Sequence, residues 1–114
     1  MLLQVPFQWH VHEAPYDYYR YTKYGLKYMF TKAGFSEVHV TPNTGFWSTM
    51  ILKANYYSKR FIRGPRLVRA FLRMCAIPGW FASQHIAYAL DAIDFHPAET
   101  AGYTVVAVKD APNA

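Results

Sequence analysis

The residues from His10 to Phe35 constrain the fold most, because they describe a helix with both ends marked and a strand that follows at once. Thr22 is placed to accept an orphan amide hydrogen bond of the first turn, so it is the predicted N-cap. Gly34 is the residue type that adopts the left-handed conformation at a helix end. A helix is therefore expected over residues 23–33, and its predicted buried face has helical spacing: Leu26, Met29, Phe30 and Ala33.

Three short segments are predicted to be strands. Residues 2–8 form an apolar run, and residues 36–41 alternate valines with polar residues, which indicates one buried and one wet face. Residues 103–109 are nearly all apolar, as is typical of a strand covered on both faces, and residues 110–114 mark the exit to solvent. The expected fold class is α/β (α+β when counted as a fragment), with one helix between the first two strands and a helical insertion before the third.

The insertion is predicted to hold three helices, at about 46–61, 65–76 and 79–93, separated by Gly64-Pro65 and Pro78-Gly79. Apolar side chains are expected to face inward. The lone cysteine, Cys75, is assigned to the apolar side of the middle helix as an inert core thiol. The first and last helices are predicted to be buried through two seams: Met50, Ala54, Tyr57 and Phe61, then Ala82, Ile86, Leu90 and Ile93.

The net charge of +5 is unevenly distributed. No acid occurs between Glu37 and Asp91, whereas seven lysines and arginines do. Such a concentration attracts acidic partners such as phospholipid headgroups, although a solvated face explains it equally simply. A single cysteine and the lack of a long apolar run favour a cytoplasmic protein, with membrane association left open. The candidates for contact with an anion or a membrane surface are Arg63, Arg66, Arg69 and Arg73.

The segment ahead of the first helix gathers histidines, acids and tyrosines. His12, Glu13 and Asp17 are residue types that bind zinc or iron. They are bunched in one loop in which Pro15 restricts how they converge, so no metal is expected. A hydrogen-bonded loop fits better, with Arg20 pairing with Asp17 or Glu13.

The motif His-Glu-x-Pro-x-Asp-Tyr-Tyr-Arg-Tyr-Thr at 12–22, followed by Gly25-Leu26, Ala33-Gly34-Phe35 and a short valine-rich strand, resembles the C-terminal half of class I S-adenosylmethionine-dependent methyltransferases. The resemblance spans nearly the whole chain but only about half of the family's fold. It implies that residues 2–8 correspond to the fifth strand of the family's sheet. It also implies that residues 103–109 lie centrally, antiparallel to both other strands.

The family's cofactor site lies in its N-terminal half, on a glycine-rich turn that lets the backbone approach the ligand. No two of the six glycines here lie close enough to form that turn. The resemblance therefore implies one partial domain, 1–114, with a helical cap at 45–95. S-adenosylmethionine is implied for the complete family but not for this chain alone, which is expected to be inactive by itself. A missing N-terminal half or a homodimer through the exposed first strand is the expected partner.

In a complete enzyme the loop would follow the carboxyl end of a strand, where α/β sheets bind ligands. His10, His12, Glu13 and Tyr18 are the candidates for the substrate mouth, with histidine as a base and tyrosine as an orienting donor. The alternative function is a non-catalytic interaction module that uses the basic helices on an anionic membrane or a protein partner. No nucleic acid is expected, because exposed aromatics do not alternate with the arginines.

Overall fold

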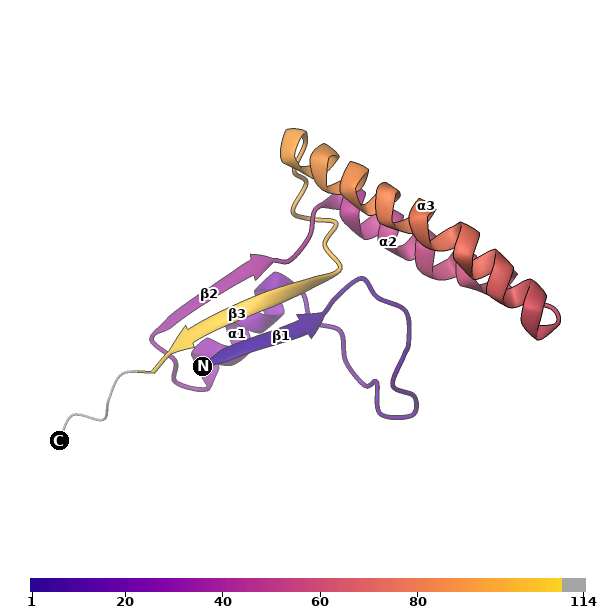
Figure 1. Cartoon of the computed structure of the whole chain (residues 1–114). Coiled ribbons are helices and arrows are strands. Elements are labelled where there is room, and N and C mark those ends of the chain that lie inside the picture. The colour runs from indigo at the N-terminus through magenta and orange to yellow at the C-terminus, as the bar shows by residue number, and fades with distance from the viewer. Residues whose placement is uncertain (110–114) are drawn as a thin grey trace.

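The computed structural model describes residues 1–109, so the predicted tail at 110–114 lies outside the described residues. Its elements follow the expected order (Figure 1). They are β1 (Leu2–Pro6), α1 (Lys23–Lys32), β2 (Glu37–Pro42), α2 (Phe46–Ser58), the short helix η1 (Lys59–Phe61), α3 (Arg66–Ile93) and β3 (Gly102–Val108).

The sheet has the strand order β1-β3-β2, and β3 is antiparallel to both neighbours. The predicted fold class, with the last strand in the centre, is confirmed. Val105 lies at the middle of the register, opposite Leu3 of β1 and Val40 of β2. The first and last strands of the chain are therefore direct neighbours.

Helix α1 covers one face of the sheet and forms the core with it. Its N-cap is Thr22, whose hydroxyl accepts the Gly25 amide hydrogen bond at 3.1 Å, and Gly34 has a φ of +83°, so both predicted ends are confirmed. Met29 and Ala33, predicted to be buried, are exposed, because only one edge of this short helix touches the sheet. The buried cluster consists of Leu26, Phe30, Val40, Tyr103, Val105 and Ala107.

The other face of the sheet is open. Leu2 is 71% exposed, and Val106 and Val108 also lie on this side. Polar neighbours such as His39 share the face, because side chains alternate along each strand. The prediction that β3 is covered on both faces is therefore wrong for this chain.

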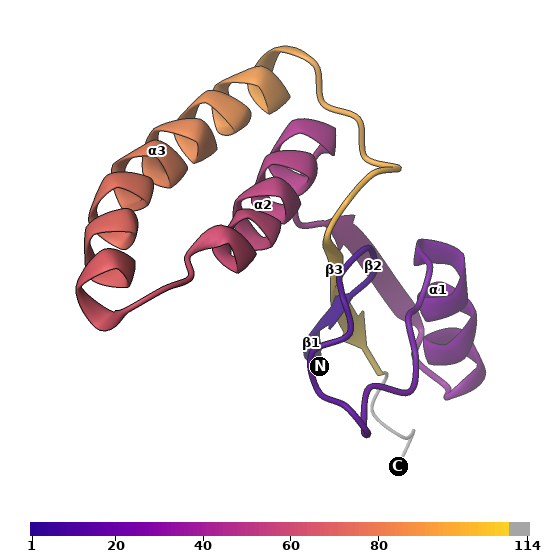
Figure 2. The same cartoon turned by 90° about the vertical axis from the view of Figure 1, so that its right-hand side faces the viewer.

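Helices α2 and α3 form an antiparallel hairpin that projects away from the sheet (Figure 2). The Cα radius of gyration is 18.6 Å, against about 13 Å for a compact domain of this length. Within residues 1–109, the two helices pack on each other and not on β1, β2 or β3. Among the helices of residues 1–109, none is both long and apolar enough to cross a bilayer.

The predicted break at Pro78-Gly79 is wrong, because α3 is continuous through both residues. A proline within a helix removes one backbone hydrogen bond and tends to kink the helix. Here the helix is held against α2 just after the proline, where the Trp80 indole donates to the Ser58 hydroxyl and the Asn55 amide donates to the Ser83 hydroxyl. That packing supports a helix across one missing bond.

The hairpin also buries different residues from those predicted. Met50, Ala54, Tyr57 and Phe61 are all exposed, and so are Ala82, Ile86 and Ile93, whereas Leu90 is half-buried. Cys75 is exposed rather than buried in the core. The apolar side of α3 faces solvent, so residues assigned to the interior from their hydrophobicity lie on the surface.

The base of the hairpin is held by Asp91, near the end of α3. Its buried carboxylate accepts backbone hydrogen bonds at the start of α2, from Trp47 at 2.9 Å, Ser48 at 3.0 Å and Gly45 at 3.2 Å. Burial would raise the pKa of Asp91, but the hydrogen bonds from Ser48, Trp47 and Gly45 outweigh it and lower the pKa below its usual value. Gly45 has no side chain to cap α2, so a residue of α3 acts as the cap.

We expect Asp91→Asn to destabilise the protein by about 1–2 kcal/mol at pH 7, because the substituted side chain loses its charge and turns an NH2 group toward backbone amides that donate to Asp91. Because the folded pKa is lowered, the carboxylate contributes stability above its unfolded pKa near 3.8 and loses it as the pH falls through the folded value. Urea unfolding at pH 7 and at pH 3 should therefore show a smaller acid loss for Asp91→Asn than for the parent. Asp94→Asn, which changes an exposed carboxylate three residues further on, is the control. Equal effects of the two substitutions would contradict the cap.

Candidate functional site

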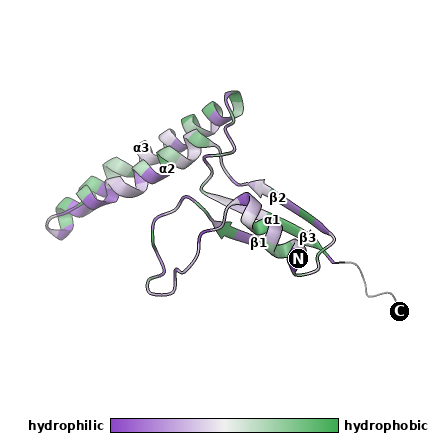
Figure 3. Cartoon of the chain, turned by 180° about the vertical axis from the view of Figure 1, so that it is seen from behind, coloured by the Kyte–Doolittle hydropathy of each residue, from purple (hydrophilic) through white to green (hydrophobic). Residues whose placement is uncertain are grey.

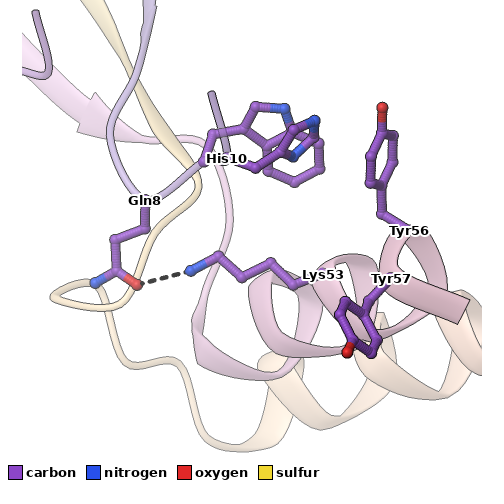
Figure 4. A pocket seen from close by; sticks show the side chains of 6 residues that line it. Gln8, His10, Lys53, Tyr56 and Tyr57 are labelled. Carbon is purple, nitrogen blue, oxygen red and sulfur yellow. Dashed lines mark hydrogen bonds between the residues drawn. The ribbon is translucent and has the colours of Figure 1, made fainter. Parts of the chain in front are cut away.

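A groove of about 520 Å³ lies between the loop that follows β1 and the outer side of α2 (Figure 4). The loop contributes residues just beyond the carboxyl end of β1, and α2 contributes residues from two successive turns. The lining residues are Gln8, Trp9, His10, Lys53, Tyr56 and Tyr57.

Three aromatic rings form one wall of the groove. The His10 imidazole stacks on the Tyr56 ring with 4.1 Å between centroids and 29° between planes. The Trp9 indole lies 4.7 Å from the imidazole and 5.7 Å from the Tyr56 ring, which it meets edge-on. These separations are those at which aromatic pairs attract each other. The contacts hold the exposed His10 side chain in one place at the mouth of the groove.

One lysine lines the groove, and a second contacts its aromatic wall. The Lys53 ammonium donates to the Gln8 side-chain oxygen at 3.3 Å, and the Gln8 amide nitrogen donates to Glu99 at 2.6 Å. The Lys59 ammonium lies 4.6 Å from the centroid of the Tyr56 ring, within the range of a cation–π contact. An aromatic wall beside ammonium groups suits a flat ligand that carries a negative or hydrogen-bond-accepting group.

The remainder of the loop is organised around Asp17, whose side chain is 8% exposed. The Arg20 guanidinium donates to this carboxylate and, at 3.2 Å, to the His10 carbonyl oxygen. The His12 amide donates to the same carboxylate at 3.2 Å. Burial would raise the pKa of Asp17, but the hydrogen bonds from His12 and Arg20 and their charges lower it. The predicted ion pair of Arg20 with Asp17 is confirmed.

The structure brings only one of the four predicted mouth residues into the groove. His10 lines it, whereas His12, Glu13 and Tyr18 border a separate shallow hollow around Asp17 and the tyrosines of the loop. The predicted arginines, Arg63, Arg66, Arg69 and Arg73, belong to the far end of the hairpin.

The residues that the sequence did not predict for the site are Gln8, Trp9, Lys53, Tyr56 and Tyr57. Lys53, Tyr56 and Tyr57 are three and four positions apart on α2, so they share one face of the helix. Their spacing was a usable signal. It was obscured because Tyr57 was assigned to a buried seam.

Within residues 1–109, no group of three or more histidine, cysteine or acidic side chains is arranged to hold a metal ion. Comparison of the chain with protein-family models, curated proteins and solved structures finds no match. The geometry of the groove is therefore the basis for the proposed function.

We expect the C–H protons of the His10 imidazole to resonate upfield of an unstacked histidine, because the Tyr56 ring lies over the imidazole. Tyr56→Leu should move these resonances downfield in ¹H–¹³C NMR spectra at constant pH. It should also mobilise the loop, because the lost ring pair contributes about 0.5–1.5 kcal/mol to holding the loop in place. Tyr57→Leu is the matched control, because Tyr57 lines the groove but makes no ring contact with His10. Similar spectra for the two variants would contradict the stacked wall.

Proposed function

We propose that this chain carries the substrate-side half of an S-adenosylmethionine-dependent methyltransferase fold and is not catalytic alone. The observation that carries the proposal is the strand order β1-β3-β2, with the last strand central and antiparallel. This is the arrangement that the resemblance to class I methyltransferases implies for their C-terminal half. The motif of residues 12–22 provides the second line of support.

The groove beside His10 is the proposed acceptor site. It lies past the carboxyl end of β1, which is the end at which open α/β sheets bind ligands. Methyl transfer depends mainly on alignment and desolvation of the acceptor, so an aromatic wall and a positioned imidazole are a sufficient substrate-side contribution. His10 is the proposed general base and Trp9 and Tyr56 the proposed positioning residues. S-adenosylmethionine would be held by the complementary half.

The open edge of β1 is the proposed place for that half, or for a second copy in its absence. The Phe7 amide donates to the Ala101 carbonyl oxygen, and the Ala107 amide donates to the Met1 carbonyl oxygen. The backbone N–H and C=O groups of the odd-numbered residues along β1 therefore point toward β3. In an antiparallel ladder the intervening residues then direct their backbone groups away from β3. Leu2 and Gln4 therefore offer unpaired amides at the edge, and a new strand can add there.

The first test is calorimetric titration of the purified chain with S-adenosylmethionine and S-adenosylhomocysteine, with its mass in solution measured in parallel. We expect no binding of either ligand and a dimer formed through β1. Binding of either ligand with micromolar affinity would mean that this chain builds its own cofactor site, and the proposal would fall.

A proline at position 4 tests the edge directly. Gln4→Pro removes an amide that points away from β3, so the β1–β3 ladder is retained and we expect a folded monomer. Gln4→Thr, which keeps the amide and favours a strand, should remain a dimer. A Gln4→Pro protein that is still dimeric would place the contact elsewhere.

A further inference from the structure

The outward side of α3 is apolar over most of its length. At about 100° per residue, positions 67, 71, 74 and 81 fall on one arc of the helix. All four are well exposed, at 84% for Leu67, 60% for Phe71, 65% for Met74 and 68% for Phe81. We call these four side chains the outer arc. Hydrophobic residues recur along both helices of the hairpin in Figure 3.

The opposite side of α3 makes the polar contacts. The Trp80 indole donates to the Ser58 hydroxyl at 2.8 Å, and the Asn55 amide donates to the Ser83 hydroxyl at 2.8 Å. Helix α3 therefore faces its partner helix with hydrogen-bonding groups and faces solvent with leucine, phenylalanine and methionine. A contiguous apolar surface of this kind marks an interaction site rather than ordinary surface.

The charge beside the outer arc identifies its occupant. Six basic residues lie between Lys59 and Arg73, and no acid occurs from residue 38 to residue 90. At about 100° per residue, Arg66 and Arg73 lie to one side of the arc and Arg69 lies nearly opposite it. All three are exposed, and Lys59 borders the same surface hollow as Arg73. Amphipathic helices that lie in a membrane interface combine these two features, an apolar face and flanking cations that reach the headgroups.

We propose that the free end of the hairpin binds the surface of an anionic lipid bilayer, with the outer arc in the interfacial layer and the arginines on the headgroups. A second copy is a poorer occupant, because it would bring another six positive charges against these. A nucleic acid would leave the outer arc in water. The hairpin lies on the bilayer and does not cross it. The proposal is independent of methyltransferase activity.

The charge is tested by vesicle co-sedimentation of the whole chain, with phosphatidylcholine alone and with phosphatidylglycerol added. We expect binding to the anionic vesicles that weakens as salt is raised. Arg66→Gln, Arg69→Gln and Arg73→Gln together should lower the partition coefficient on the order of a hundredfold, since each surface cation contributes about fivefold. Lys23→Gln, Lys27→Gln and Lys32→Gln remove the same charge from exposed positions of α1 and should change little.

The outer arc is tested by Leu67→Gln, Phe71→Gln and Phe81→Gln together, which should lower partition at least about tenfold without loss of helix content. The proposal would be overturned if the folded parent did not bind anionic vesicles. It would also be overturned if the arginine and lysine variants lost vesicle binding to the same extent. Adding the three apolar substitutions to the Gln4→Pro protein distinguishes self-association through the outer arc from self-association through the edge of β1. A dimer of Gln4→Pro that this variant dissociates would make a second copy the occupant and overturn the membrane proposal.

Discussion

The pairing of β3 with both outer strands is the constraint on which the structure depends. β1 and β2 make no ladder with each other, and the buried side chains Tyr103, Val105 and Ala107 all belong to β3. The chain must therefore return from the hairpin to the place where it left the sheet. Asp91 of α3 brings the two ends of the hairpin together, because its carboxylate accepts a backbone hydrogen bond at the start of α2. The Thr44 hydroxyl accepts the Ala101 amide at 2.9 Å and so links the exit from β2 to the entry into β3. The hairpin is fixed at its base while its body stays clear of the sheet.

Sequence reasoning predicted the part of the fold that local signals determine. Thr22 and Gly34 act through hydrogen bonds and dihedral angles within a few residues of themselves, so their roles follow from the sequence alone. The hairpin was assigned on the assumption that apolar residues face inward. That assumption fails for α3, whose apolar arc faces solvent, and it misplaced Cys75 and Ile86 together. The physical reason is that hydrophobicity shows which side of a helix will be covered but not what covers it.

Only the part of the candidate site that lies on the loop after β1 was predictable from the sequence. His10 could be assigned from its place after a strand, because that position is set by the sheet. Its partner Tyr56 lies 46 positions along the chain, and their contact depends on the direction in which the hairpin leaves β2. That direction is set by the Asp91 cap and by the threonine hydrogen bonds at the base of the hairpin. None of these residues belongs to a recognisable sequence motif. The spacing of Lys53 and Tyr56 on α2 indicates that they share one face of the helix. It does not indicate which loop that face contacts.

The two proposed surfaces lie on opposite sides of the hairpin. On α2, Asn55 and Ser58 face α3, whereas Lys53, Tyr56 and Tyr57 point to the groove on the far side of the helix. The outer arc of α3 in turn faces away from α2. A bilayer bound to the outer arc would therefore leave the groove open to water, so the surfaces do not compete. If both proposals hold, the methyl acceptor reaches His10 from the aqueous side, and the membrane serves to locate the protein rather than to present the acceptor from beneath α3.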